Sequence, residues 1–342
     1  MIVAPYSGVR SLSVEFIWKH RRSLVAERDT PAGIPQVYLS KRLQTSSLPV
    51  VHPPIMPASL PDGKPGTIEI HGHRGARGLR PENTRAAFTT ALSLGATALE
   101  MDVVIAGDGE VIVSHEPWFH AATCSFPDGR PIPRWQQRRY RIFEMTTAEV
   151  QRFDCGLRPH PKFPEQVPVP SYKPQLLEVV QQAEAVAAAQ DRPKPLYSIE
   201  VKSRVRWEGR YHPGPRAFVQ AVHRVLHAEG VVERSSILSF DYRILRAARE
   251  ESSAWALNML AGRFPRRSLE RRLAALGFTP DIVGPDHRLV TPEVVQRAHA
   301  EGMRVVPWTV NAPNRMQALA AMGVDGITTD YPDRAVALFH RA

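Results

Sequence analysis

The feature that most constrains the fold of this chain is a regular alternation of short apolar runs with amphipathic helices from residue 67 onward. Nine runs have the length and composition of strands: 67–73, 97–105, 110–114, 196–202, 235–240, 254–260, 281–284, 303–310 and 326–330. Helices are expected to begin at Thr84, Leu176, Pro215, Asp241, Arg266, Pro292 and Pro313. This alternation predicts a parallel sheet, and the roughly 275 residues available suit an eight-stranded α/β barrel, which typically uses about 250.

Turn-forming residues mark the ends of the predicted helices. Asn83 or Thr84 is expected to cap the first helix. A glycine suited to the left-handed end of a helix follows several of them: Gly95, Gly230, Gly277, Gly302 and Gly323.

Nine strands are one more than the barrel needs. The runs 97–105 and 110–114 are joined by Ala-Gly-Asp-Gly, which resembles a hairpin turn, so one run is expected to lie outside the barrel or not to be a strand.

Two segments depart from the alternation. Residues 1–66 show no sustained period and are rich in helix and strand breakers, so they are interpreted as a tail or linker before a barrel domain at 67–342. A true start at Met56 would explain them equally well. Residues 117–173 combine many prolines with aromatic side chains. A loop this long is usually a lid or an inserted subdomain, and we expect one directly after the third strand.

Composition excludes some classes of function. Lys and Arg outnumber Asp and Glu by 44 to 34, which gives a net charge of +10. A basic, soluble surface is the first interpretation, and attraction of anions such as phosphates, nucleic acid or membrane lipid is the functional alternative. The charge is spread along the chain without a Lys-rich tail or zinc-finger spacing, so no nucleic-acid partner is expected. No run of about 18 apolar residues is present, so no transmembrane helix is expected. The sequence carries no signal for an oligomeric state.

The two cysteines and the first residues bear on the cellular compartment. Cys124 and Cys155 could form one bridge or remain two buried thiols. No secretory signal is recognisable, because Arg10 and Glu15 interrupt the only apolar candidate, 9–18. A cytoplasmic location is therefore the default expectation, with a periplasmic or secreted one as the alternative.

Polar side chains occur at the carboxyl ends of the predicted strands, where barrel enzymes place their functional groups. Alternation along a strand puts Glu100 and Asp102 on one face, and likewise Glu200 and Lys202. The full set of candidates is His73, Arg74, Glu100, Asp102, His115, Glu200, Lys202, Phe240 and Trp308. We expect these side chains to face one mouth of the barrel.

The three carboxylates lie in apolar runs, where an unpaired charge is costly. Glu100 and Asp102 belong to Ala-Leu-Glu-Met-Asp-Val-Val-Ile, and Glu200 to Leu-Tyr-Ser-Ile-Glu-Val-Lys. A metal ion would offset this cost, and three oxygen ligands suit a hard divalent cation such as Mg²⁺ or Ca²⁺. A plain ion pair between Glu200 and Lys202 is the structural alternative.

The remaining candidates suggest acid–base chemistry on a phosphate. His73 and His115 beside a carboxylate cluster indicate a general acid and a general base, although a lone histidine is more often a satisfied core residue. Arg74 offers a bidentate fork and Lys202 a point charge for phosphate. The structural alternative for Arg74 is a salt bridge to Glu82.

These residues stand in motifs that resemble the glycerophosphodiester phosphodiesterase family over residues 67–338. The motifs are His73-Arg-Gly-Ala-Arg-Gly-Leu-Arg-Pro-Glu-Asn-Thr84, Glu100-Met-Asp102, His115, Glu200-Val-Lys202, Ser239-Phe240, Trp308-Thr-Val-Asn311 and Thr329-Asp-Tyr-Pro-Asp333. The resemblance implies a TIM barrel with an insertion after the third strand. It also implies a divalent metal on Glu100, Asp102 and Glu200, an acid–base pair of His73 and His115, phosphate on Arg74 and Lys202, and glycerol beside Phe240 and Trp308.

The implied reaction is hydrolysis of a small-molecule glycerophosphodiester to glycerol 3-phosphate and an alcohol, with water or the glycerol 2-hydroxyl as the attacking group. Glu116 departs from the family pattern, in which many members have Asp after the second histidine. One rival is a barrel amidohydrolase with His71 and His73 as its metal pair, but the runs 235–240 and 254–260 supply no further histidine. The other rival is a non-catalytic phosphate-binding module, although no expected site residue is missing.

Overall fold

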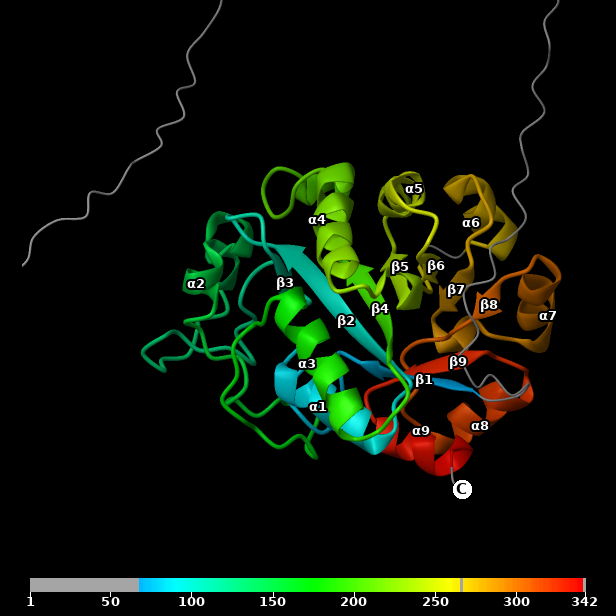
Figure 1. Cartoon of the computed structure of the whole chain (residues 1–342), viewed down its shortest axis with the longest axis horizontal. Helices are drawn as coiled ribbons and strands as arrows, with labels where there is room; N and C mark the ends of the chain where they lie inside the picture. The colour runs from blue at the N-terminus through cyan, green and yellow to red at the C-terminus, as the bar shows by residue number, and fades with distance from the viewer. Residues whose placement is uncertain (1–67, 265–266, 341–342) are drawn as a thin grey trace, which may run out of the picture. The chain divides into compact units, whose positions relative to one another are not determined.

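The structure is a computed structural model that describes residues 68–264 and 267–340. The predicted tail, 1–66, lies outside the described residues. Eight parallel strands follow one another around a barrel, with helices outside them (Figure 1). They are β1 (Glu69–His73), β2 (Ala98–Ile105), β4 (Leu196–Val201), β5 (Ser235–Ser239), β6 (Ala256–Ala261), β7 (Ile282–Pro285), β8 (Arg304–Val305) and β9 (Gly326–Thr329). The TIM-barrel prediction is therefore confirmed.

Backbone hydrogen bonds connect β8 to β9, the two strands at the ends of the sheet order. The amide of Asp325 donates to the carbonyl of Val305 at 3.0 Å, and that of Thr328 donates to Pro307 at 3.0 Å. The predicted strand 303–310 was too long, because only Arg304–Val305 pairs as a strand. Pro307 has no N–H to continue a ladder, which accounts for the early end.

The ninth predicted strand does lie outside the barrel. β3 (Val111–Val113) pairs antiparallel with the end of β2, with Val103 opposite Val113 and Ile105 opposite Val111. The turn between them contains Gly109 in the left-handed conformation, at φ 86°. β3 runs back along the end of β2 outside the barrel, so the residues that follow β3 begin at the barrel mouth.

One helix follows each barrel strand in the chain, and all but the last of these helices lead to another barrel strand. They are α1 (Arg85–Leu94), α3 (Leu176–Ala189), α4 (Pro215–Ala228), α5 (Tyr242–Glu251), α6 (Leu269–Leu276), α7 (Pro292–Ala300), α8 (Pro313–Ala321) and α9 (Pro332–Phe339). The start expected at Arg266 lies outside the described residues, and α6 begins after Ser268, whose side chain caps the helix by accepting from Arg271 N. The sequence analysis missed α9, although Pro332 at its first position is the same signal that located α7 and α8.

Residues 114–175 form irregular structure with one short α-helix, α2 (Thr147–Val150), and two single-turn 3-10 helices, Gln137–Arg139 and Ile142–Glu144. Their side chains build a hydrophobic cluster of their own beside the barrel core, in which Phe119 stacks on Phe153 at 3.8 Å between ring centroids. Cys124 and Cys155 are joined by a disulfide within this cluster, so the alternative of two free thiols does not hold. The segment thus has a packed interior rather than the character of an open loop.

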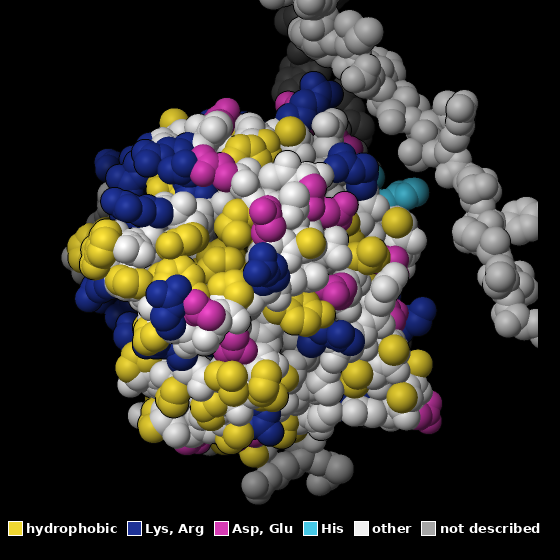
Figure 2. Space-filling view, turned by 90° about the vertical axis from the view of Figure 1, so that its left-hand side faces the viewer, with side chains coloured by type: hydrophobic (Ala, Val, Ile, Leu, Met, Phe, Trp, Pro, Cys, Tyr) yellow, Lys and Arg dark blue, Asp and Glu magenta, His cyan; other side chains and the backbone are white. Residues whose placement is uncertain are grey.

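The described surface mixes polar and apolar groups. On the face shown in Figure 2, hydrophobic side chains lie among charged ones, and Lys and Arg gather at its upper left. Across the residues that the structure describes, the helices are too short or too polar to pass through a bilayer.

Glu69 supplies a buried ion pair at the amino-terminal end of the barrel. Its carboxylate accepts a hydrogen bond from His71 Nε2 at 3.0 Å and lies 2.5 Å from the guanidinium of Arg304. Burial alone would raise the pKa of Glu69, but the His71 hydrogen bond and the Arg304 charge outweigh burial and lower the pKa to about 2. The ionised form of Glu69 is therefore favoured in the folded chain.

This pair should make part of the stability depend on pH. Above about pH 4.5 the contribution of Glu69 is fully present, and it is lost as the pH falls towards 2, because the unfolded chain takes up the proton first. The shift corresponds to about 3 kcal/mol. Urea unfolding of the wild type and Glu69→Gln should show the wild type more stable at pH 7, with the difference shrinking by about that amount at pH 2. A difference that stays constant with pH would contradict the assignment.

Candidate active site

The register of the sheet brings the three predicted carboxylates together. In the parallel pairing of β2 with β4, Asp102 lies directly opposite Glu200, and in the pairing of β1 with β2, His73 lies opposite Glu100. One oxygen from each of Glu100, Asp102 and Glu200 lies within 4.8 Å of the others. Glu100 and Asp102 are buried, while Glu200 is partly exposed. The spacing predicted from alternation is thus realised at one end of the barrel.

The charges of this cluster are incompletely balanced by protein groups. Burial and the neighbouring carboxylates of Asp102 and Glu200 raise the pKa of Glu100 well above its usual range. Burial alone would also raise the pKa of Asp102, but the positive charges of Lys202 and Arg74 outweigh it and lower the pKa. Lys202 Nζ lies 2.6 Å from Glu200 and 3.0 Å from Asp102. Three hard oxygen donors with an excess of negative charge at Glu100 fit a divalent cation.

Arg74 and Glu100 are joined through the turn after β1. Arg74 has a left-handed backbone, at φ 51°, and its amide donates to Glu100 Oε2 at 2.8 Å. Its guanidinium lies 2.9 Å from Glu82 and 3.0 Å from Asp102. Gly75 must be glycine, because a Cβ there would meet the backbone of Ala87 at 2.5 Å. The salt bridge to Glu82 that was the alternative for Arg74 is present, and it holds the guanidinium at the site.

The ring of His73 is held by a carboxylate directly after the last strand. Its Nδ1 donates to Asp330 Oδ1 at 2.6 Å, and its Nε2 lies 3.9 Å from Glu100 Oε2. Burial and the positive charge of Arg77 lower the pKa of His73 to about 4, although Asp330 acts in the opposite direction. Because the Nδ1–H group donates to Asp330, the Nε2 lone pair of the neutral ring is left to face the cluster.

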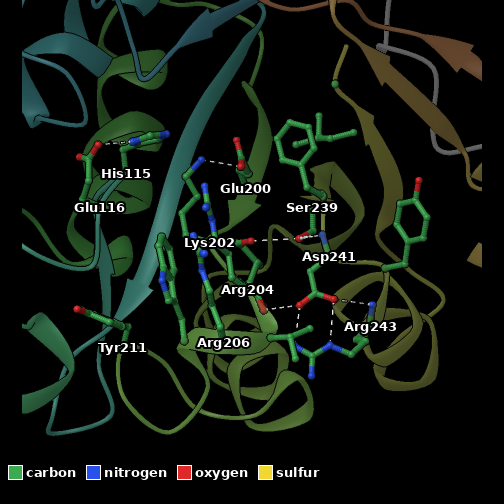
Figure 3. Close-up of a pocket in the computed structure, with 18 of the residues that line it drawn as sticks. His115, Glu116, Glu200, Lys202, Arg204, Arg206, Tyr211, Ser239, Asp241 and Arg243 are labelled. Atoms are coloured by element: carbon green, nitrogen blue, oxygen red, sulfur yellow. Dashed lines mark hydrogen bonds and ion pairs between the residues drawn. The ribbon is translucent and has the colours of Figure 1, made fainter. Parts of the chain in front are cut away.

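His115 approaches the same mouth from outside the barrel, two residues after β3. Its Nδ1 hydrogen-bonds to Glu116 Oε1 at 2.7 Å. The glutamate that follows the second histidine in this chain therefore contacts the ring of that histidine. Burial alone would raise the pKa of Glu116, but the His115 hydrogen bond outweighs it and the pKa is lowered. Figure 3 shows His115 and Glu116 on the side of the pocket that faces Lys202 and Glu200.

A cavity of about 300 Å³ joins the predicted site residues. Phe240 and Trp308 form one wall, edge to face with their ring centroids 5.5 Å apart. Trp308 is fixed by donation from its Nε1 to Gly284 O at 2.7 Å, whereas Phe240 is 48% exposed. Of the nine residues singled out from the sequence, only Asp102 does not line this cavity, and it lies beneath it among the cluster: the lining members are His73, Arg74, Glu100, His115, Glu200, Lys202, Phe240 and Trp308.

The amidohydrolase alternative fails on the position of His71. Its Nδ1 bonds to Ser198 Oγ at 2.9 Å and its Nε2 to Glu69, so both ring nitrogens are already engaged in a polar network inside the barrel. Among residues 68–264 and 267–340, the side chains placed closely enough to hold a metal ion together are Glu100, Asp102 and Glu200, and no histidine belongs to this group. His71 and His73 therefore do not act as a metal pair.

Some residues of the site were missed or given a lesser role. Asn83 was considered only as a helix cap, but Thr84 takes that role, while Asn83 Nδ2 donates to Asp102 Oδ2 at 2.8 Å. Asp330 received no role of its own, yet it holds His73 and is itself held by Asn311 Nδ2 at 2.7 Å. Asp330 directly follows β9, so the strand-end rule applied to the other candidates was the available signal.

Comparisons with known proteins agree with this geometry. Residues 73–334 match the Glycerophosphoryl diester phosphodiesterase family. A glycerophosphodiester phosphodiesterase of Bacillus altitudinis is 29% identical over 78% of this chain and 96% of its own. A solved structure from Silicibacter pomeroyi, provisionally described as a glycerophosphoryl diester phosphodiesterase, is 30% identical, with a TM-score of 0.72 over 81% of this chain and 95% of that one.

A phosphodiesterase from Oleispira antarctica, solved with the product sn-glycerol-3-phosphate, shares the fold at 20% identity, with a TM-score of 0.62 over 80% of this chain and 98% of that one. The family match spans most of the present chain and includes both predicted histidines and all three clustered carboxylates. The chain therefore belongs to the glycerophosphoryl diester phosphodiesterase family.

Proposed function

We propose that this chain hydrolyses glycerophosphodiesters to glycerol 3-phosphate and an alcohol. The observation that carries the proposal is the convergence of the carboxylate trio, within 4.8 Å, with two histidines and two cations on one cavity of about 300 Å³. Curated relatives that align along nearly their whole length are named for this activity. The product complex of the Oleispira antarctica protein supports the same reaction for the fold.

The residues suit binding of a phosphodiester at the barrel mouth. Glu100, Asp102 and Glu200 would hold a divalent cation, Mg²⁺ or Ca²⁺, which when bound neutralises phosphate charge that otherwise repels an attacking oxygen. Arg74 and Lys202 add positive charge for the non-bridging oxygens. Phe240 and Trp308 provide an apolar wall for the glycerol carbons.

His73 and His115 provide the proton transfers. One ring accepts the proton of the attacking hydroxyl as its oxygen bonds to phosphorus. Attack by water gives glycerol 3-phosphate directly, whereas attack by the glycerol 2-hydroxyl gives a cyclic phosphate, which water then opens to glycerol 3-phosphate in a second step. The other ring gives a proton to the oxygen of the departing alcohol as the P–O bond breaks. Asp330 and Glu116 position the two rings through the Nδ1 hydrogen bonds of 2.6 and 2.7 Å.

An assay for released glycerol 3-phosphate tests this proposal directly. With glycerophosphocholine, glycerophosphoethanolamine and glycerophosphoglycerol as substrates, we expect release that is abolished by EDTA and restored by Mg²⁺ or Ca²⁺, with a bell-shaped pH profile. Heat-treated protein is the control for spontaneous hydrolysis. Release that is insensitive to chelator would remove the metal from the proposal, and absence of release from every substrate would remove the reaction.

A further inference from the structure

The small cavity opens into a larger one. A second cavity of about 1150 Å³ shares His115, Glu200, Lys202 and Phe240 with the first. If the phosphate lies at the carboxylate trio, as in the proposed function, the two arms of the diester occupy different cavities. Glycerol fits the smaller, more enclosed cavity, so the departing alcohol lies in the larger one.

The larger cavity is strongly basic. Of the described residues that line it, nine are Lys or Arg and three are Asp or Glu. Each of the three acids already has a positive or hydrogen-bonding partner. The pairs are Glu116 with His115, Glu200 with Lys202, and Asp241 with Arg243. The three acids are thus matched by partners within or beside the cavity.

Four exposed arginines of this cavity have no carboxylate within 4.0 Å in the described part of the chain: Arg138, Arg204, Arg206 and Arg210. Three of them lie in the segment between β4 and α4, directly after the Lys202 of the site. Figure 3 shows Arg204 and Arg206 in the same pocket as Lys202 and Glu200, beside Tyr211. A guanidinium without a carboxylate partner at a ligand cavity is suited to phosphate or carboxylate groups.

The aromatic rings of the larger cavity already have guanidinium groups over them, which leaves them poorly suited to bind a cationic head group. Trp118, Trp207 and Tyr211 form a cluster with ring centroids 5.5–5.6 Å apart. A quaternary ammonium binds over such rings, but each ring here already has a guanidinium against it. The pairs are Arg138 over Trp118 at 5.0 Å, Arg204 over Trp207 at 4.5 Å, and Arg210 over Tyr211 at 5.4 Å.

We propose that the preferred substrates are glycerophosphodiesters whose departing alcohol itself carries negative charge, such as a phosphorylated polyol. This inference rests on the proposed function and specifies its substrate class. The anionic group of the alcohol would lie among Arg138, Arg204, Arg206 and Arg210, while a choline or ethanolamine group would meet uncompensated positive charge. Selectivity is therefore set on the side of the site opposite to glycerol.

The test compares head groups of different charge in the glycerol 3-phosphate assay with Mg²⁺ or Ca²⁺ present. The probes are glycerophosphoinositol 4-phosphate, uncharged-head glycerophosphoglycerol and cationic-head glycerophosphocholine. We expect kcat/KM to be at least about tenfold higher for the first than for the last, and to fall with added salt for the first alone. Free inositol 4-phosphate should inhibit competitively, whereas choline should not.

The double variant Arg204→Gln/Arg206→Gln separates this idea from a general loss of activity. It should lower kcat/KM for the phosphoinositol substrate about tenfold, mainly through KM, and leave glycerophosphocholine within about twofold. Arg224→Gln, an exposed arginine on α4 that does not line the cavity, is the matched control. Equal kcat/KM for all head groups, or an equal loss for all in the double variant, would overturn the inference while the phosphodiesterase proposal stands. No release from any substrate would overturn the phosphodiesterase proposal first.

Discussion

Replacing His115 by Ala is expected to lower kcat at least about a hundredfold, because a positioned acid or base contributes roughly 10²–10⁴ to the rate. His115 lines both cavities at the mouth, and its side chain is 32% exposed. Its ring bonds to Glu116 and to no other described residue. Removing the ring should therefore leave the free energy of unfolding nearly unchanged. Steady-state kinetics and thermal unfolding of the same preparation measure the two effects.

His120→Ala is the matched control for this variant. His120 lies in the same segment after β3 but lines neither of the two cavities, so its loss should leave kcat close to the wild-type value. Near-normal turnover of His115→Ala would remove the acid–base role of that ring. A fall in kcat that matches a fall in melting temperature in both variants would instead indicate that the segment had been disordered.

The arrangement of the carboxylates could be predicted because it depends on short-range rules. A spacing of two along a strand puts Glu100 and Asp102 on the same face whatever the neighbouring strand is. Parallel strands end at the same edge, so Glu200, at the end of a later strand, was expected at the same mouth. These rules leave open only the register of β2 against β4, and the structure places Asp102 opposite Glu200.

The support of the histidine could not be predicted in the same way. The bond between His73 and Asp330 joins residues 257 positions apart and depends on β9 pairing with β1, the last strand of the chain with the first. The second partner of Arg74 depends on its left-handed backbone, which no local pattern indicated. Asn83 shares that conformation, at φ 56°, and its amide reaches Asp102 instead of capping the helix. Strained backbone at two adjoining site residues is typical of groups held in place for function.

The cluster also shows how the site trades stability for chemistry. Lys202 and Arg74 balance Asp102, but among the described residues the Glu100 side chain accepts only from the Arg74 amide and faces two further carboxylates. Burial and these two carboxylates raise the pKa of Glu100. A fold selected for stability alone would place a neutral side chain there, because a buried charge without a counter-ion is costly. The excess negative charge is explained if a cation completes the site.

Replacing Glu100 by Gln is therefore expected to have opposite effects on activity and on stability. It should lower kcat/KM at least about a thousandfold, because the site loses a ligand for a cation that contributes several kcal/mol to the reaction. In EDTA, at pH values high enough to ionise Glu100 in the wild type, the variant should melt at a higher temperature, since the neutral amide no longer repels Asp102 and Glu200. The amide oxygen can still accept from Arg74 N, which is 2.8 Å from the present carboxylate.

Metal titration separates this explanation from a general effect of removing a charge at the mouth. Added Mg²⁺ or Ca²⁺ should raise the melting temperature of the wild type and leave that of Glu100→Gln nearly unchanged, because only the former binds the ion tightly when folded. Asp286→Asn is the matched control: Asp286 is a buried acid directly after β7 that pairs with Arg288 outside the trio, so this variant should keep the metal response and most of the activity. A Glu100→Gln protein that retains both wild-type kcat/KM and the metal-induced stabilisation would show that the trio does not hold the catalytic cation.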